Sequence, residues 1–108
     1  MKSPVYVAGK MTGLPAYNYP AFHAAAATLR ALGHTVLNPA ENPAPPCGTW
    51  QAYMRMALAQ LVQCQTIVML PGWGHSKGAL IERNLALALG IKVVSFADVE
   101  QELQALCN

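Results

Sequence analysis

One glutamate follows a glycine-rich loop at the start of a predicted helix, an arrangement suited to sugar or phosphate chemistry. The segment Leu70–Glu82 reads LPGWGHSKGALIE and joins the apolar run 66–70 to a helical pattern over 77–89. Loops between a buried strand and a helix hold phosphates and sugars in α/β proteins, because the first amides of the helix face the ligand. A carboxylate just inside the helix adds the possibility of covalent attack on a sugar. Glu82 is therefore the candidate nucleophile.

The residues beside Glu82 leave room for a ligand. Gly78 and Ala79 lie four and three positions before Glu82, on the same helix face, and carry almost no side chain. Gly78 costs about 1 kcal/mol against alanine in a helix, so a close backbone approach would explain its presence. The other interpretation of Glu82 is an ordinary solvated glutamate. The other carboxylates are Glu41, near the end of the second predicted strand, and Asp98, Glu100 and Glu102, which cluster near the C-terminus, so carboxylate chemistry rests mainly on Glu82.

Several neighbouring side chains have both a functional and a structural interpretation. Ser76 stands at the N-cap position, where its hydroxyl either closes the helix or binds an anion together with the amides of residues 77–79. Trp73 stacks on a base or ribose, or lies at a subunit contact. Tyr6 points its hydroxyl at the site, or packs in the core. Lys10 meets a phosphate, or stays solvated.

The elements that must position these residues alternate along the chain. Apolar runs ending at glycine, proline or polar residues predict four strands, over 4–8, 34–37, 66–70 and 91–96. Helical spacing of apolar residues predicts helices that begin after the candidate N-caps Asn18, Thr49, Ser76 and Asp98. Gly33 and Gly90 are expected to end the first and third helices.

This alternation predicts a three-layer α/β domain. Right-handed crossovers between successive strands give a parallel sheet with helices on both faces, of expected order 2-1-3-4. Ligands bind such sheets beyond the carboxyl ends of strands one and three, where the winding reverses. The loops 9–17 and 71–76 are therefore the expected site. We expect one flavodoxin-like, Rossmann-like domain over residues 1–108.

The composition limits the kinds of partner that we expect for this chain. The chain is 54% hydrophobic and 11% charged, which argues against disorder. Its net charge is +2 with the basic residues scattered, so no nucleic-acid polymer is expected. No apolar run is long enough for a membrane span, and three cysteines without metal-ligand spacing predict reduced thiols in the cytoplasm. We expect no metal or cofactor, and a homodimer or larger homo-oligomer because so short and apolar a chain exposes much surface.

These residues resemble a small phage and bacterial family of unknown function. The first part of the pattern is Tyr6-Val7-Ala8-Gly9-Lys10-Met11-Thr12-Gly13, then Asn18, Phe22, Gly33-His34-Thr35-Val36 and Asn38-Pro39. The later part is Leu70-Pro71-Gly72-Trp73, Ser76-x-Gly78-Ala79-x-x-Glu82 and residues 86–90. That family looks like a compact branch of the nucleoside 2-deoxyribosyltransferase superfamily, which includes deoxynucleoside 5′-monophosphate N-glycosidases.

The resemblance implies a role for each matching residue. Glu82 stands in the place of a glutamate that attacks the anomeric carbon, and Tyr6 in that of a tyrosine that orients it. Ser76 matches a serine that helps hold a 5′-phosphate in the nucleotide hydrolases. Superfamily members are dimers or larger, and a neighbouring subunit completes each site. Relatives usually carry an aspartate near Gln65 that assists departure of the base, and glutamine cannot replace it in proton transfer.

We therefore expect an N-glycosidase or deoxyribosyltransferase-like enzyme acting on a nucleoside or a nucleoside 5′-monophosphate through a covalent glycosyl-glutamate. The catalytic residues would be Glu82 and Tyr6. The substrate-binding residues would be Gly9, Lys10, Trp73, Ser76, Gly78 and Ala79. The alternative, motivated by Gln65, is a non-catalytic nucleotide-binding or nucleotide-sequestering protein on the same fold. A third possibility is a partner-binding module that retains the fold only.

Overall fold

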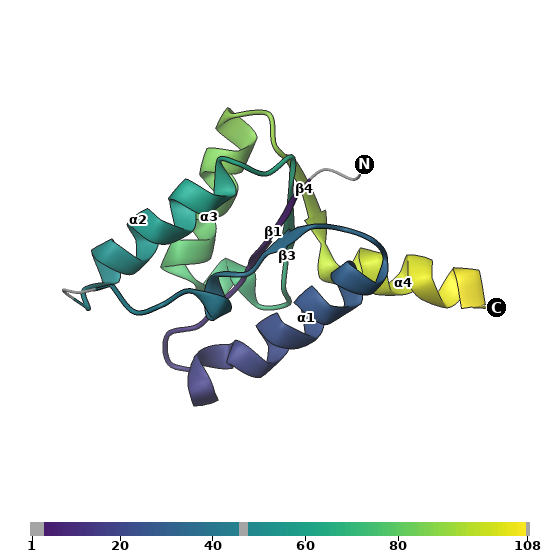
Figure 1. Ribbon diagram of the computed structural model, residues 1–108, viewed down its shortest axis with the longest axis horizontal. Coiled ribbons are helices and arrows are strands. Elements are labelled where there is room, and N and C mark those ends of the chain that lie inside the picture. Colours follow the sequence, from purple (N-terminus) through teal and green to yellow (C-terminus); the bar gives the residue numbers. More distant parts are fainter. Residues whose placement is uncertain (1–3, 46–47, 108) are drawn as a thin grey trace.

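The sheet is parallel and four-stranded, and helices cover both of its faces (Figure 1). This computed structural model describes residues 4–45 and 48–107. The strands, in the order β2-β1-β3-β4, are β1 (Val5–Ala8), β2 (Val36–Leu37), β3 (Thr66–Met69) and β4 (Lys92–Ser95). The helices are α1 (Tyr19–Ala31), α2 (Trp50–Leu61), α3 (Lys77–Ala88) and α4 (Phe96–Cys107). The predicted fold class and strand order are confirmed.

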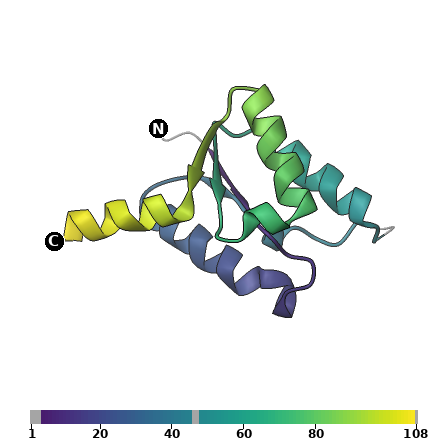
Figure 2. The ribbon, with the colours of Figure 1, turned by 180° about the vertical axis from the view of Figure 1, so that it is seen from behind.

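The two faces of the sheet divide the core into two layers. Along β1, Tyr6 and Ala8 join the cluster that α2 and α3 cover, whereas Val5 and Val7 join the cluster under α1. The same alternation runs along β3, as side chains of successive strand residues point to opposite faces. Figures 1 and 2 show α2 and α3 on one side of the sheet and α1 on the other, with α4 running outward from the end of β4. Tyr6 therefore faces α3, the helix that carries Glu82.

One predicted helix cap and one predicted helix start differ from the structure. Asn18 precedes α1, but it has a left-handed backbone with φ of 61°, and its side chain donates to the Lys10 carbonyl instead of capping the helix. Ala16 and Tyr17 before it are also left-handed, within the 3-10 turn η1 (Pro15–Asn18). The last helix begins at Phe96 rather than after Asp98, because the Ser95 hydroxyl accepts the amide hydrogen of Asp98. In both cases a hydrogen bond to a nearby carbonyl or hydroxyl group replaces the predicted cap.

The other expected helix ends are confirmed. Thr49 and Ser76 accept amide hydrogens from the first turns of α2 and α3. Gly33 and Gly90 follow α1 and α3 with φ of 93° and 74°, a left-handed conformation that glycine adopts without a steric cost. The second strand is shorter than expected, and only Val36 and Leu37 pair with β1.

The loop between β2 and α2 begins with the 3-10 turn η2 (Pro39–Glu41). Cys47 and part of this loop lie outside the described residues. Cys64 is buried, and its thiol donates to the Gln60 carbonyl. Within the described part of the chain, no helix combines the length and the apolar character needed to cross a bilayer.

Candidate functional site

A buried tyrosine and a buried glutamate meet at the bottom of the site. Tyr6 is the second residue of β1 and is fully buried, while Glu82 stands in the second turn of α3 and is 6% exposed. The Tyr6 hydroxyl donates a hydrogen bond to Oε2 of Glu82. The side chain of a solvated helix glutamate would extend into water, so the burial of Glu82 excludes that interpretation, and its role as nucleophile stays a prediction. Tyr6 likewise both packs in the core and points its hydroxyl at the carboxylate.

Burial sets the acid–base properties of this pair. Burial raises the pKa of Glu82 from 4.5 to about 7, and the hydrogen bond from Tyr6 acts in the opposite direction. The pKa of Tyr6 lies well above its ordinary value, chiefly because of burial and then because of the nearby Glu82 charge. Tyr6 therefore keeps its proton and remains a donor, while Glu82 exchanges its proton near neutral pH. Such a perturbed carboxyl in a cavity marks a candidate functional site.

The pair opens into a cavity of about 790 Å³, large enough for a mononucleotide. Its lining comes from the loop after β1, from η1, from the first turns of α2 and α3, and from residues beside η2. Among the lining residues Glu82 is the only carboxylate, and Lys10, His75 and Lys77 supply the basic groups. The cavity therefore holds one carboxyl group, whose charge changes near neutral pH, together with basic side chains.

All but one of the predicted site residues line this cavity. They are Tyr6, Gly9, Lys10, Ser76, Gly78, Ala79 and Glu82. Ser76 also caps α3, since its Oγ accepts the Ala79 amide hydrogen at 3.1 Å. A hydroxyl that accepts one hydrogen bond can still donate another, so the cap leaves Ser76 able to bind an anion.

The two glycines of the site are explained by contacts within the protein. A Cβ on Gly9 would stand 2.9 Å from Cβ of Leu70, so a side chain at position 9 would displace Leu70, the residue that directly follows β3. A Cβ on Gly78 would stand 3.1 Å from Sδ of Met54, on α2. The close approach that the sequence indicated at Gly78 is thus made by the neighbouring helix.

Trp73 does not line the cavity. It lies in the 3-10 turn η3 (Trp73–His75), and its ring packs against the core cluster beneath α2 and α3. The Arg83 guanidinium lies 5.0 Å from the centre of the ring. The geometry therefore does not support the predicted contact between Trp73 and a base.

Aromatic residues from two other elements line the cavity instead. They are Tyr17 and Tyr19, around the start of α1, and Trp50 and Tyr53, in the first turn of α2. In the sequence, Trp50 and Tyr53 begin an apolar stripe that continues through Ala57 and Leu61, and such a stripe is typical of core packing. Ala57 and Leu61 are indeed buried, whereas Trp50 and Tyr53 are 38% and 41% exposed. Two large aromatic residues at the start of this stripe were the signal in the sequence that this part of α2 could contact a ligand.

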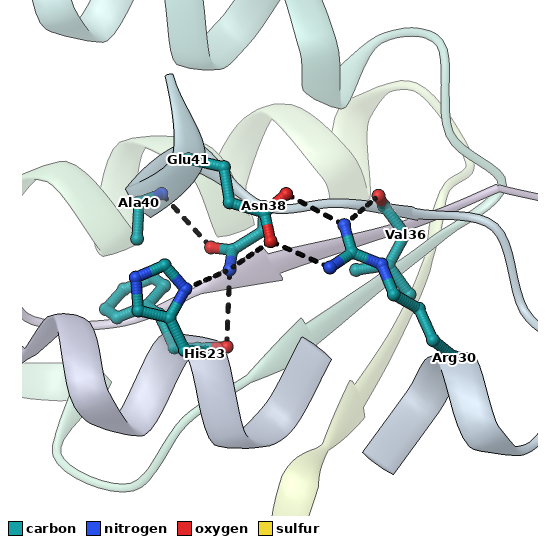
Figure 3. Close-up of polar contacts among 7 residues, drawn as sticks. His23, Arg30, Val36, Asn38, Ala40 and Glu41 are labelled. Carbon is teal, nitrogen blue, oxygen red and sulfur yellow. Dashed lines mark hydrogen bonds and ion pairs between the residues drawn. The ribbon is translucent and has the colours of Figure 1, made fainter. Parts of the chain in front are cut away.

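Glu41, the other carboxylate predicted near the strand ends, takes part in a structural cluster (Figure 3). The Arg30 guanidinium donates to both Glu41 oxygens, at 2.7 and 2.8 Å, and also to the Val36 carbonyl. The buried amide of Asn38 accepts from the Ala40 backbone and contacts Glu41. The Arg30 hydrogen bond lowers the pKa of Glu41, which therefore stays ionised and paired. This leaves Glu82 as the carboxylate available for chemistry in the cavity.

Gln65 lies outside the cavity lining and is exposed at the amino end of β3. Its backbone donates to the Pro4 carbonyl and accepts from the Lys92 amide. Gln65 therefore links the amino ends of β1, β3 and β4. The missing aspartate that the resemblance implies at this position therefore does not bear on the groups around Glu82. Among the described residues, no three histidine, cysteine, aspartate or glutamate side chains are grouped as metal ligands would be.

Comparisons with known proteins place the chain in a family without assigning an activity. Residues 3–95 match the model of a family described as Domain of unknown function (DUF4406). That segment includes the whole sheet, α1 to α3 and both residues of the Tyr6–Glu82 pair, and it ends where α4 begins. No curated protein matches the chain.

Proposed function

We propose that this chain, which belongs to the family described as Domain of unknown function (DUF4406), cleaves the N-glycosidic bond of a nucleoside or a nucleoside 5′-monophosphate. The observation that carries the proposal is the buried Tyr6–Glu82 pair at the base of a nucleotide-sized cavity. A fixed carboxylate beside a cavity lined by aromatic and basic side chains suits attack on a sugar that carries a base and a phosphate. The resemblance to the nucleoside 2-deoxyribosyltransferase superfamily points to the same chemistry.

In the proposed reaction the ionised Glu82 acts as nucleophile. One of its oxygens bonds to C1′ as the bond from C1′ to the base nitrogen breaks, through a transition state that resembles an oxocarbenium ion. The base leaves with the electron pair of the broken bond and takes a proton from solvent. Water then adds to C1′ and releases a proton, and the Glu82 carboxylate leaves. Two displacements give net retention, and a second base in place of water would give transfer instead of hydrolysis.

The surrounding residues would hold the reactants in place. Tyr6 fixes one carboxylate oxygen and favours its charged form, which the nucleophile requires. The Ser76 hydroxyl, together with the amide of Gly78, would hold a 5′-phosphate at the start of α3, where the helix dipole favours an anion. The Ala79 amide, which the sequence also placed here, already donates to Ser76 in the helix cap. Lys10 would add a positive charge on the other side of the loop pair.

The test is release of free base, followed by chromatography, from a panel of nucleosides and their 5′-monophosphates. We expect release from at least one of them, and its loss in Glu82→Gln, which keeps the shape of the side chain and can still accept from Tyr6. Glu100→Gln, which removes an exposed carboxylate on α4, is the matched control and should release base at the parent rate. Release by Glu82→Gln at the parent rate would show that Glu82 is not the nucleophile. Tight nucleotide binding without any release would favour the nucleotide-binding alternative.

A further inference from the structure

Two residues at the cavity mouth, Trp50 and Lys77, form a contact that the proposed reaction does not use. Trp50 is the first residue of α2 and Lys77 the first of α3, and both line the cavity. The Lys77 ammonium lies over the Trp50 ring, 4.9 Å from its centre. At this distance a cation is attracted to the negative face of the aromatic ring.

A helix cap holds the backbone of Trp50, and the Trp50 ring lies beside the start of α3. The Thr49 hydroxyl accepts the Ala52 amide hydrogen and so fixes the first turn of α2. An atom of the Trp50 ring, Cζ2, lies 3.8 Å from the point that a Gly78 Cβ would occupy, so the ring edge borders the start of α3. With 38% of its surface exposed, Trp50 presents a flat apolar surface to a ligand in the cavity.

We infer that Trp50 is the surface on which the base stacks, and that Lys77 covers this surface until the phosphate of the ligand draws the ammonium away. The choice of ligand rests on the proposed function. An ammonium forms a stronger bond with a phosphate than with a ring face, because a charge-assisted hydrogen bond forms between opposite charges. Phosphate binding would therefore uncover Trp50, and a base and a phosphate on one ligand would bind cooperatively.

This arrangement favours a nucleoside monophosphate over either of its parts. A nucleoside must displace Lys77 from the ring without offering it a phosphate. A sugar phosphate attracts Lys77 but has no base to stack on Trp50. The selectivity for the monophosphate thus comes from one lysine that exchanges partners.

The chain contains its own matched control, because its second tryptophan has the same type of contact outside the cavity. Arg83 lies over Trp73 at 5.0 Å, and Trp73 does not line the cavity. With Trp73→Phe, fluorescence reports on Trp50 alone, and with Trp50→Phe it reports on Trp73 alone. Both variants are best made in the Glu82→Gln chain, so that binding is measured without turnover.

The experiment titrates these chains with purine and pyrimidine nucleoside 5′-monophosphates, the corresponding nucleosides and ribose 5-phosphate. We expect monophosphates to quench Trp50 saturably and to leave Trp73 unchanged. Trp50→Ala should weaken monophosphate binding roughly 10-fold or more, while ribose 5-phosphate affinity changes little. Quenching of Trp73 with Trp50 unchanged, or no binding of any probe by calorimetry, would overturn the inference.

A Lys77→Met variant tests the exchange of partners. Methionine keeps a similar length without the charge, so the ring is no longer covered by a cation. We expect weaker binding of monophosphates together with tighter binding of nucleosides. A lysine that only attracts phosphate would leave nucleoside affinity unchanged, and that result would refute the covering role. If Trp50 behaves as expected while the parent chain releases no base, the binding inference stands and the proposed reaction fails.

Discussion

Replacing Tyr6 by phenylalanine removes one hydroxyl and keeps the ring that packs in the core. The hydroxyl donates to Glu82, and this bond lowers the pKa that burial raises to about 7. Without it the protonated form of Glu82 is favoured further. Tyr6→Phe should therefore raise the pKa of Glu82 and shift the pH at which cleavage begins upward.

The size of this shift follows from the strength of the hydrogen bond. A hydrogen bond to a charged group contributes about 1.5–3 kcal/mol, and one pKa unit corresponds to 1.36 kcal/mol, so the pKa should rise by about 1–2 units. At pH 7 the ionised fraction of Glu82 would fall from about half to about 1–10%, which slows attack by the carboxylate roughly 5–50-fold. The loss shrinks as the pH rises and nearly vanishes at about pH 9.5.

Two measurements check this prediction. Carbon NMR of the glutamate carboxyl groups gives the titration midpoint of Glu82 without any substrate, and the rate of base release gives the pH profile of the reaction. Tyr53→Phe is the matched control, since it removes a phenolic hydroxyl that lines the cavity and that is not hydrogen-bonded to Glu82. The control should leave the Glu82 midpoint within a few tenths of a unit.

Equal slowing by Tyr6→Phe at every pH, or a Glu82 midpoint that stays constant or falls, would show that Tyr6 does not set the charge of Glu82. The parent profile is equally informative. A carboxylate nucleophile requires activity that rises as the pH increases through 7, whereas activity that falls there would identify the protonated acid as the reactive form.

Three further perturbations have defined outcomes. Because the folded pKa of Glu82, about 7, exceeds its ordinary 4.5, the folded state holds the proton longer, so stability should fall by about 3 kcal/mol as the pH rises from 4.5 through 7. Glu82→Gln should abolish this fall in urea unfolding and make the chain more stable than the parent at about pH 8. Gly9→Ala should cost about 1–3 kcal/mol, since its Cβ meets Leu70 at 2.9 Å, whereas Gly74→Ala, with nothing within 4 Å, should unfold like the parent. Ser76→Ala should lose about 1 kcal/mol with the N-cap, and Ser76→Asp should keep the cap yet bind monophosphates less tightly in calorimetry, by charge repulsion.

Most of the fold could be predicted because each crossover obeys strong local rules. Apolar runs, cap residues such as Thr49 and Ser76, and terminal glycines such as Gly33 act within a few residues. The alternation of strands and helices then leaves few topologies. Asn18 precedes α1 as predicted, but its side chain bonds to the Lys10 carbonyl and does not cap the helix. Asp98 was wrongly assigned as a cap, because the Ser95 hydroxyl accepts an amide hydrogen one turn earlier and α4 begins at Phe96.

The part of the site that lies at the carboxyl ends of the strands could be predicted from the sequence. The part that lies on the first turn of α2 could not. Glu82, Ser76 and Gly78 are held at the start of α3, and the sheet topology alone brings them near Gly9 and Lys10. A helical stripe does not reveal where the sheet that it covers stops. The first turn of α2 lies beyond the core cluster, so Trp50 faces the cavity although its spacing is that of a core residue.

The position of Gln65 changes the reason for doubting turnover. The resemblance implied that a proton donor for the departing base is missing near Gln65. In the structure Gln65 is exposed at the amino end of β3, so an aspartate there would not line the cavity. Among the residues that line the cavity, Glu82 is the only carboxyl group, and the proposed reaction uses it to attack the sugar. The proposed reaction, in which the base takes its proton from solvent, depends on stabilising the sugar cation and not on a second carboxylic acid. Its rate should therefore depend strongly on how readily each base leaves.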